Sequence, residues 1–274
     1  MTVTHPAPMT WSALPLLKGK TVVVTGSASG IGLETARLCT AMGATVLGVD
    51  LTRRFDHVEE FYRADLSDPR AIDALVDVLP DGIHGLANIA GLPPTAPADK
   101  VLAVNLLGLK RLTLALVPKL ADGASIVNLA SLAGFGWPQA IPAIRASEDL
   151  DWDGLAEFMA RWGVTNEGGR SYFFTKEALI AWTMQHRWTW RDRGIRMNAV
   201  SPGPVDTPIL KDFVETLGAR AEEDMKTMDR PGTPADIAPV VAFLLSDMTR
   251  WIRGTNIPTD GGMASHILCG AHGL

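Results

Sequence analysis

A tyrosine and a lysine four residues apart form the clearest candidate for chemistry in this 274-residue chain. Tyr172 and Lys176 fall in a stretch with helical spacing, and residues four apart share one face of a helix. A nearby ammonium group favours the phenolate and lowers a tyrosine pKa from its ordinary value of about 10. The pair therefore predicts a general acid/base, Tyr172, whose pKa is lowered by Lys176. A coincidence of two surface residues is the alternative, although the chain holds only one other tyrosine, Tyr62.

A glycine-rich turn near the N-terminus predicts a site for a dinucleotide. Gly26, Gly30 and Gly32 lie in TGSASGIG, between a β-branched stretch and a stretch with helical spacing. Backbone amides and the helix dipole at such a junction can hold a pyrophosphate, and Ser29 and Ile31 would lie beside it. The spacing differs from that of the commonest dinucleotide fingerprint, so a turn that serves packing alone is the alternative.

The choice of dinucleotide depends on Asp50, which closes the second expected strand 18 residues after Gly32. A carboxylate there would hydrogen-bond the ribose hydroxyls and repel a 2′-phosphate, which favours NAD over NADP. Arg53 and Arg54 lie close enough in sequence to keep NADP as an alternative. An Asp that only caps a turn is the other interpretation of this position.

Three further residues follow strands at the same side of the expected sheet. Leu51 comes directly after Asp50, and Asp65 with Leu66 ends the third strand. We expect these residues to flank the adenosine part of the dinucleotide. Asp65 is also a good cap for the helix that follows, and both interpretations stay open.

Strand-like and helix-like stretches alternate along the chain, which predicts an α/β fold with a doubly wound parallel sheet of the Rossmann type. We expect a flexible N-terminal arm over residues 1–16 and a single domain over residues 17–274. Strands are expected at 21–26, 44–50, 61–67, 83–91, 124–131, 195–202 and 255–262, and helices at 33–43, 69–80, 98–120, 171–193 and 234–247.

An inserted segment, residues 132–170, separates Ser131 from Tyr172. It contains an expected helix from Asp149 to Trp162 with an apolar stripe at near-helical spacing. This stripe either packs on the body of the protein, or borders the substrate pocket, or changes the helix face used for subunit association. The stripe comprises Trp152, Leu155, Ala156, Met159 and Trp162.

Composition excludes several classes of protein. The chain has 25 Lys plus Arg against 30 Asp plus Glu, and a formal net charge of −5 argues against a nucleic-acid-binding protein. Only two cysteines occur, Cys39 and Cys269, which favours a reducing cytoplasm. We expect no secretion signal and no membrane span. His84, His186 and His266 are too scattered to predict a catalytic metal.

Taken in order, these motifs resemble the short-chain dehydrogenase/reductase family. The resemblance rests on TGSASGIG, the stretch from Asn88 to Gly91, Asn105, Ser131 and the segment from Tyr172 to Lys176. It covers the chain from about residue 18 to residue 262. The long Ser131–Tyr172 separation looks like the branch that contains coniferyl-alcohol dehydrogenases and 3α-hydroxysteroid dehydrogenase/carbonyl reductases.

The resemblance implies a role for each matching residue. Tyr172 would exchange a proton with the substrate oxygen, and Ser131 would orient that oxygen. Lys176 would bind the nicotinamide ribose, and Asn105 would hold a water that relays protons from Lys176. Further cofactor contacts are implied for Asn88, Ile89, Ala90, Gly91, Pro202, Gly203, Val205 and Thr207.

The residues after Ser131 and Thr207 suggest an apolar substrate pocket. We expect it to be lined by Ser131, Phe135, Trp137, Ile209, Leu210 and Phe213. Few cations lie among them, so an apolar or aromatic alcohol fits better than a phosphorylated or acyl-carrier substrate. The segment from Ile209 to Leu217, followed by residues 219–230, is either a mobile lid or a fixed amphipathic helix.

The sequence as a whole therefore predicts an NAD-dependent oxidoreductase for a hydrophobic alcohol, aromatic or steroid-like, and the matching carbonyl compound. An NADPH-dependent carbonyl or 3-oxoacyl reductase is the alternative enzyme. A dinucleotide-sensing protein without turnover is the alternative from another class. The resemblance also implies a homodimer or homotetramer, and we expect neither nucleic acid nor membrane as a partner.

Overall fold

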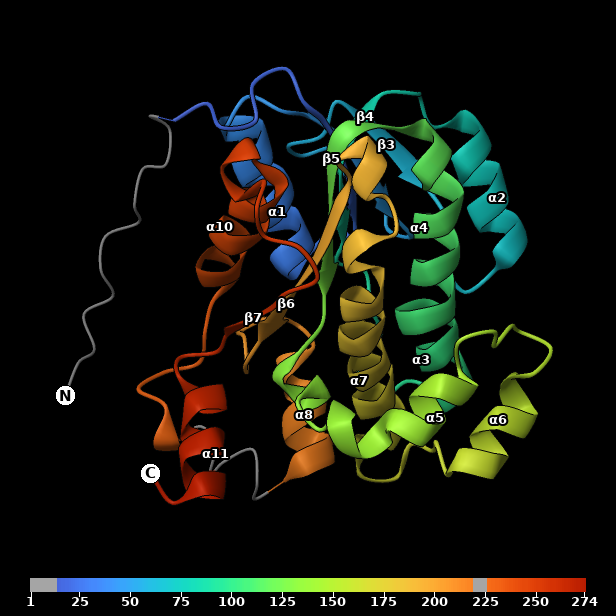
Figure 1. Ribbon diagram of the computed structural model, residues 1–274, viewed down its shortest axis with the longest axis vertical. Coiled ribbons are helices and arrows are strands. Elements are labelled where there is room, and N and C mark those ends of the chain that lie inside the picture. The colour runs from blue at the N-terminus through green and yellow to red at the C-terminus, as the bar shows by residue number, and fades with distance from the viewer. Residues whose placement is uncertain (1–13, 219–225) are drawn as a thin grey trace.

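A seven-stranded parallel sheet runs through the centre of the protein (Figure 1). The computed structural model describes residues 14–218 and 226–274. The strand order is β3-β2-β1-β4-β5-β6-β7, and every neighbouring pair is parallel. The predicted doubly wound sheet is confirmed. Its strands are β1 Thr21–Thr25, β2 Thr45–Asp50, β3 Glu60–Arg63, β4 Ile83–Asn88, β5 Leu120–Leu129, β6 Arg196–Pro202 and β7 Asn256–Thr259.

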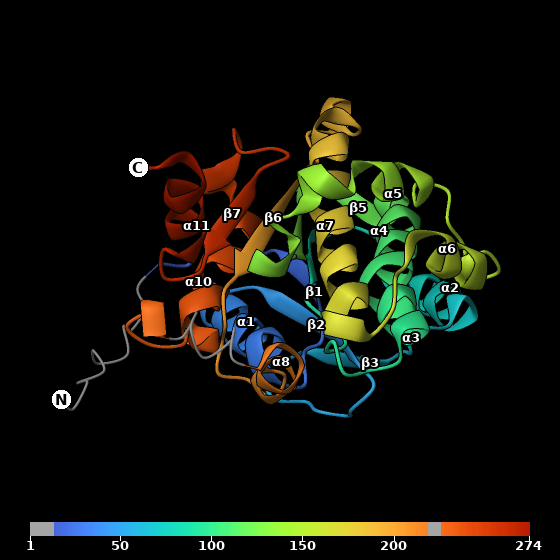
Figure 2. The same cartoon turned by 90° about the horizontal axis from the view of Figure 1, so that it is seen from below.

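Helices cover both faces of the sheet, which is why the central strands are apolar almost throughout (Figure 2). One face packs against α1 and α10, and the other packs against α2, α4 and α7. The order of the strands changes direction between β1 and β4, and at such a point a crevice opens at the carboxyl ends of the strands. The covering helices are α1 Gly30–Ala41, α2 Pro69–Val78, α3 Ala98–Leu102, α4 Leu109–Leu116, α7 Arg170–Gln185 and α10 Pro234–Leu245.

The long apolar helix expected over residues 98–120 forms, but it is interrupted. Between α3 and α4 the turn Ala103–Gly108 is π-helical. Gly108 lies where a Cβ would come 2.0 Å from the carbonyl oxygen of Leu66, so the helix can approach the loop after β3 only because this residue has no side chain. The helical stretch Ala98–Lys119 is long and apolar enough to cross a membrane, yet it is mostly buried within this fold. It is a core helix.

Two expectations about helices are corrected. The helix expected over residues 171–193 ends at Gln185 and continues only as short 3₁₀ turns, because the ring of His186 stacks against Trp190 and turns the chain there. A helix at the C-terminus was not expected, since its apolar residues have no strong periodicity. It is α11, Met263–His272; Figure 2 shows it apart from α8, Leu210–Leu217, although residues of both helices line one cavity.

The inserted segment forms two short helices, α5 Ile141–Ala146 and α6 Leu155–Trp162. The helix expected from Asp149 therefore starts later, because the Asp151 carboxylate accepts a hydrogen bond from the amide of Gly154 and closes a turn first. Ala156 is exposed, and Phe158 is buried in its place against α3 and α7. The stripe thus packs on the body of the protein.

The described residues include only parts of the predicted N-terminal arm and of the predicted lid segment. Residues 1–13 of the expected arm lie outside the described residues, whereas Leu17 is fully buried against the core beside β1 and α1. Residues 219–225, which belong to the expected lid segment, also lie outside them. Before them, α8 is an amphipathic helix with Leu210 and Phe213 toward the cavity at the carboxyl ends of the strands.

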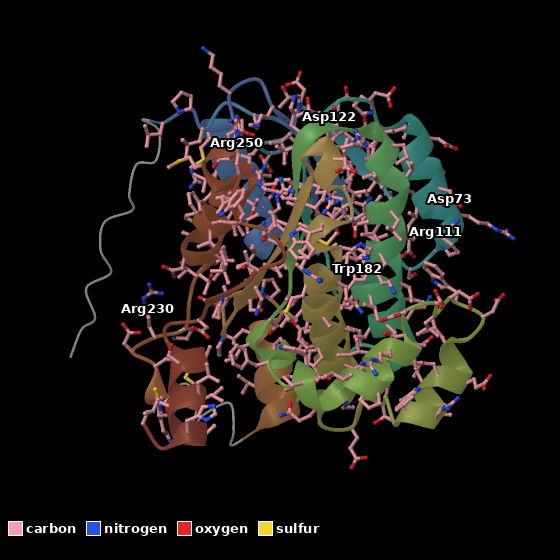
Figure 3. The ribbon with its side chains drawn as sticks, viewed as in Figure 1. Asp73, Arg111, Asp122, Trp182, Arg230 and Arg250 are labelled. Carbon is pink, nitrogen blue, oxygen red and sulfur yellow. The ribbon has the colours of Figure 1, made fainter. Side chains whose placement is uncertain are left out.

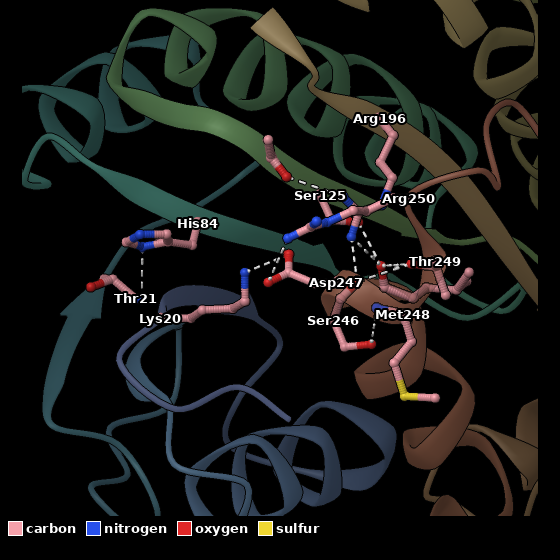
Figure 4. A network of polar contacts seen from close by, with 12 residues as sticks. Lys20, Thr21, His84, Ser125, Arg196, Ser246, Asp247, Met248, Thr249 and Arg250 are labelled. Carbon is pink, nitrogen blue, oxygen red and sulfur yellow. Dashed lines mark hydrogen bonds and ion pairs between the residues drawn. The ribbon is translucent and has the colours of Figure 1, made fainter. Parts of the chain in front are cut away.

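The amino ends of the strands hold a polar network that closes the other end of the sheet (Figure 4). The buried Arg196 guanidinium donates to the carbonyl oxygens of Gly123 (3.0 Å), Leu244 (3.3 Å) and Ser246. Lys20 Nζ lies 3.0 Å from Asp247 Oδ1. Figure 3 labels Arg250 and Asp122 at this same end of the molecule. The hydrogen bonds and the ion pair of these charged groups hold α10 and the turn after it against the sheet.

Candidate active site

The carboxyl ends of the central strands open into a large cavity of about 980 Å³. Three of the four predicted catalytic residues, Ser131, Tyr172 and Lys176, line it, whereas Asn105 does not. The five other residues expected in the substrate pocket line it as well. They are Phe135, Trp137, Ile209, Leu210 and Phe213.

Tyr172 and Lys176 share the cavity face of α7, as their spacing predicts. The ammonium nitrogen of Lys176 lies 5.4 Å from the centre of the Tyr172 ring and donates a 2.7 Å hydrogen bond to the carbonyl oxygen of Leu129. The ring of Phe213 meets the Tyr172 ring edge-on, with centroids 4.9 Å apart. Strand β5 and helix α8 therefore fix the orientation of the pair.

The predicted direction of the Tyr172 pKa shift is wrong for this structure. Burial raises the pKa of Tyr172 to about 12, and hydrogen bonding with Ser131 only partly opposes it. Burial also lowers the pKa of Lys176 to about 8, because the charged form loses solvation. The sequence could not show how deeply both groups are buried. At neutral pH the pair therefore consists of a protonated phenol beside an ammonium group.

Ser131 stands just beyond β5, where the chain leaves the sheet. Its hydroxyl oxygen accepts a 3.1 Å hydrogen bond from the amide of Ala133 and caps the short 3₁₀ turn Leu132–Gly134. This turn packs tightly on α7, because a Cβ on Gly134 would lie 2.6 Å from the carbonyl oxygen of Lys176. Ser131 is thereby held next to Tyr172.

Asn105 is buried in the π-helical turn, and its side chain has a different partner from the expected one. Its Oδ1 accepts a 2.7 Å hydrogen bond from the amide of Leu92, and its Nδ2 donates to the Leu92 carbonyl oxygen at 3.0 Å. Both polar ends of the side chain are therefore engaged. This arrangement positions the loop after β4. One N–H of the amide nitrogen and one lone pair of its oxygen have no hydrogen-bond partner among the described residues, so the relay role stays a prediction.

A second hollow of about 260 Å³ adjoins the cavity and is lined by the predicted cofactor residues of β1, β2, β3 and β4. Thr207 and Ile209 line both hollows, so the two are continuous along one side. The predicted residues found here are Gly26, Ser29, Gly30, Ile31, Gly32, Asp50, Leu51, Asp65, Leu66, Ile89, Ala90, Gly91 and Thr207. Pro202, Gly203 and Val205 line the large cavity instead.

The glycine turn is packed so closely that side chains at two of its glycines would collide with the backbone. A Cβ on Gly32 would lie 2.0 Å from the carbonyl oxygen of Gly26, and Gly26 itself has φ +72° with Ala90 backbone atoms 2.9 Å from its Cβ position. The first turn of α1 has no acidic residue, so its amides face the hollow without a competing anion. These residues can hold a pyrophosphate in the predicted way.

Asp50 lines this hollow, and its carboxylate also shapes the loop around it. Its Oδ2 accepts a 3.0 Å hydrogen bond from the amide of Ala28, and its Oδ1 accepts one of 2.9 Å from Thr52. Arg54 is held nearby by Asp56 (2.7 Å) and by the carbonyl oxygen of Ala28 (3.1 Å). A carboxylate and a guanidinium therefore lie on neighbouring parts of one loop.

Asn88 is the one predicted cofactor residue that lines neither hollow. Its amide nitrogen donates to Thr113 Oγ1 of α4 and to Asn128 Oδ1 of β5, both at 2.9 Å, in the buried interior of the protein. The predicted contact with the cofactor is therefore corrected. These bonds instead connect β4 to β5 and α4.

Several lining residues were not predicted from the sequence. Glu177 follows Lys176 directly, and its place next to the motif was the signal that could have found it. The residues of α11 carry no such signal, because only the tertiary fold brings this helix over the cavity. The unpredicted lining includes Leu92, Leu129, Gln139, Phe173, Glu177, Pro204, Val214, Ile267, Leu268, Ala271 and His272.

Comparison with known proteins identifies this arrangement. Residues 20–147 match the family model described as short chain dehydrogenase, and residues 155–264 match the one described as enoyl-(acyl carrier protein) reductase. A coniferyl-alcohol dehydrogenase of Pseudomonas sp. (strain HR199 / DSM 7063) is 43% identical over 91% of this chain and 98% of its own length. A 3-alpha-hydroxysteroid dehydrogenase/carbonyl reductase of Comamonas testosteroni is 30% identical, over 88% and 95%.

Solved structures agree. The crystal structure of a 3-alpha-hydroxysteroid dehydrogenase from Pseudomonas sp. B-0831 complexed with NADH superimposes with a TM-score of 0.76 at 29% identity. It covers 90% of this chain and 98% of that one. Together with the glycine turn and the Ser131, Tyr172 and Lys176 constellation, these matches show that the chain belongs to the short-chain dehydrogenase/reductase family of NAD(P)-dependent oxidoreductases.

Proposed function

We propose that this enzyme uses NAD to interconvert a hydrophobic aromatic alcohol and its carbonyl compound. The observation that carries the proposal is the placement of Ser131 and Tyr172 in an apolar cavity of about 980 Å³ beside the dinucleotide hollow. Phe135, Trp137 and Phe213 give this cavity an aromatic lining. The resemblance to a coniferyl-alcohol dehydrogenase supports an aromatic substrate, and the resemblance to hydroxysteroid dehydrogenases keeps a polycyclic alcohol as the second candidate.

The side chains of this site need only to position the reactants and to move one proton, because the bound dinucleotide supplies hydride chemistry. In the reducing direction, the protonated Tyr172 phenol donates a proton to the developing alkoxide, and the Ser131 hydroxyl orients that oxygen. The Lys176 ammonium lowers the cost of charge on Tyr172. In the oxidising direction the same phenolic oxygen accepts the proton.

The charge of the cavity favours a neutral substrate. Lys176 is the only Lys or Arg among the described lining residues, and it is engaged with the Leu129 carbonyl oxygen. A phosphorylated or acyl-carrier substrate would need cations at the cavity wall.

Asp50 supports NAD as the cofactor, because its carboxylate lies where a 2′-phosphate would be repelled. Arg54 is tied to Asp56 and Ala28, which reduces its freedom to bind that phosphate. We expect Asp50→Ser to lower kcat/KM with NAD at least tenfold and to raise the NADP/NAD preference. A wild-type preference for NADP would contradict the cofactor proposal.

The decisive test is absorbance at 340 nm with purified protein, NAD or NADP, and a panel of coniferyl alcohol, benzylic alcohols and a 3α-hydroxysteroid. Turnover of an aromatic alcohol with NAD is the expected result. Turnover of the steroid alone would select the second candidate. No turnover of any member by protein that binds NAD in calorimetry would contradict the proposed substrate class.

We further propose that the enzyme is cytoplasmic and forms a homodimer or homotetramer. Cys39 and Cys269 are both free, which suits a reducing compartment. Phe243 in the last turn of α10 and Met248 and Trp251 just after this helix are exposed, and Trp251 is 97% exposed. Such apolar exposure suits a contact between subunits. Light scattering of the purified protein gives the mass that tests this.

A further inference from the structure

One acidic side chain lies in the wall of the otherwise apolar cavity and takes no part in the proton transfer described above. Glu177 follows Lys176 on α7, lines the cavity and is only 5% exposed. A buried carboxylate is costly unless its oxygens are paired. The hydrogen-bond partners of the Glu177 carboxylate therefore indicate which kind of ligand group can bind beside it.

Arg170 pairs with only one of the two carboxylate oxygens. Arg170 Nη2 donates to Glu177 Oε2 at 2.7 Å, and the guanidinium also lies over the ring of Phe174, 5.7 Å from its centroid. Within residues 14–218 and 226–274, no hydrogen bond reaches Glu177 Oε1. This oxygen lies 3.1 Å from the position that a Cβ on Gly136 would occupy. The absence of a side chain at Gly136 leaves room for the carboxylate.

Helical geometry separates Glu177 from the reacting centre. Residues 172 and 177 differ by about 140° around the helix and by about 7.5 Å along it. Phe173 lies between them in the cavity lining. Tyr172 and Glu177 thus lie at two separate positions in the same cavity wall. Tyr172 faces the position of the reacting oxygen, and Glu177 faces that of a more distant part of the substrate.

The ion pair selects the kind of group that binds there. Arg170 balances the charge of Glu177, so the pair as a whole offers little attraction for a cation. Oε1 receives no hydrogen bond from the described residues and remains accessible in the cavity wall, so it can accept a hydrogen bond from a ligand there. A neutral hydroxyl group meets both conditions.

We propose that Glu177 determines specificity by accepting a hydrogen bond from a second hydroxyl group of the substrate, remote from the carbinol that reacts. This inference builds on the proposed function and narrows its substrate class to hydroxylated aromatic alcohols, in which a phenol is the donor. A site built around such a bond discriminates strongly against the analogue that lacks the hydroxyl.

Two matched pairs of alcohols test it: 4-hydroxycinnamyl with cinnamyl alcohol, and 4-hydroxybenzyl with benzyl alcohol. In at least one pair, the wild-type enzyme is expected to favour the hydroxylated member at least tenfold in kcat/KM. Glu177→Leu should lower kcat/KM at least tenfold for that member, mainly through KM, and change its partner less than twofold. Glu177→Gln, which keeps the shape, should fall between.

Gly136→Ala is the second variant, because its new methyl group crowds Oε1 without removing the charge. It should reduce the same preference by a smaller factor. Equal losses for both members of each pair in Glu177→Leu would show a purely structural role and overturn the inference. So would a wild-type enzyme without preference in either pair.

Binding separates this inference from the proposed reaction. If the wild-type protein oxidises none of the four alcohols, the proposed function fails, and calorimetric titration of the same alcohols in the presence of NAD still tests Glu177. A Kd preference for the hydroxylated member that disappears in Glu177→Leu supports the inference. Absence of that preference, or of any binding, refutes it.

Discussion

The two ends of the sheet use buried cations in opposite ways. At the amino ends of the strands, Arg196 donates to three carbonyl oxygens that come from β5, α10 and the turn after α10. At the carboxyl ends, Lys176 donates to the Leu129 carbonyl oxygen and faces an open cavity beside Tyr172. The amino end therefore stabilises the fold, whereas the carboxyl end keeps polar groups available for a ligand.

Burial shifts the pKa of both cations downward, but only one shift matters near neutral pH. Arg196 starts so high that it keeps its charge, whereas the pKa of Lys176 falls to about 8. Burial thus leaves Arg196 permanently charged at one end of the sheet and makes Lys176 titratable near neutral pH at the other. Substitutions at each end test this difference.

The largest effect is expected from Tyr172→Phe, which removes the phenolic hydroxyl that exchanges the proton with the substrate and keeps the ring against Phe213. We expect kcat to fall about 10³-fold, since general acid/base catalysis contributes on this scale. The Kd for NAD, measured by calorimetry, should change less than threefold. A variant with kcat close to wild type would show that Tyr172 is not the acid/base. The proposed functional difference between the two ends of the sheet would then be wrong.

The next effect is a pH dependence of stability that Lys176→Met should abolish. The unfolded lysine keeps its proton up to about pH 10.5, whereas the folded one loses it near pH 8. The unfolded state binds more protons between these values, so the free energy of unfolding contributed by Lys176 rises with pH there. The penalty of burying the charge is fully present below about pH 8.

This rise is measured by urea unfolding of both proteins between pH 7.5 and 10.5. A difference of 2.5 pKa units at about 1.4 kcal/mol each gives about 3.5 kcal/mol. Tyr172 titrates in both proteins, so its own effect above pH 10 cancels in the comparison. A constant difference in stability across this range would show that Lys176 is solvated in the folded protein.

The smallest of the three effects belongs to the amino end. Arg196→Met leaves three carbonyl oxygens with a lost donor, and we expect the free energy of unfolding to fall by about 2 kcal/mol. Both kcat and KM should stay within twofold of wild type, because the network lies at the far end of the sheet.

Lys20→Ala is the matched control at that end. Its partner Asp247 is about half exposed, so the ion pair contributes less than about 1 kcal/mol. Urea midpoints and steady-state kinetics of both variants give the comparison. An Arg196→Met enzyme with unchanged stability and altered KM would reverse the roles assigned to the two ends.

Much of the site follows from local sequence. Gly26, Gly30 and Gly32 line the predicted hollow, because a strand-turn-helix junction forms from neighbouring residues. Tyr172 and Lys176 share a face for the same reason, since helical periodicity is local. Asn88, in contrast, hydrogen-bonds Thr113 of α4 and Asn128 of β5, and a short motif does not reveal which residues of a strand end reach the cofactor hollow.

The sequence alone therefore determined the order of strands and helices, the glycine turn and the residue types that perform the chemistry, because each depends on neighbours in the chain. Only the tertiary structure decided the raised pKa of Tyr172, the engagement of Asn105 with Leu92 and the cover that α11 gives the cavity. It also decided that Arg170 leaves one oxygen of Glu177 for a ligand. These properties arise from burial and from contacts between residues far apart in sequence, which no local pattern encodes.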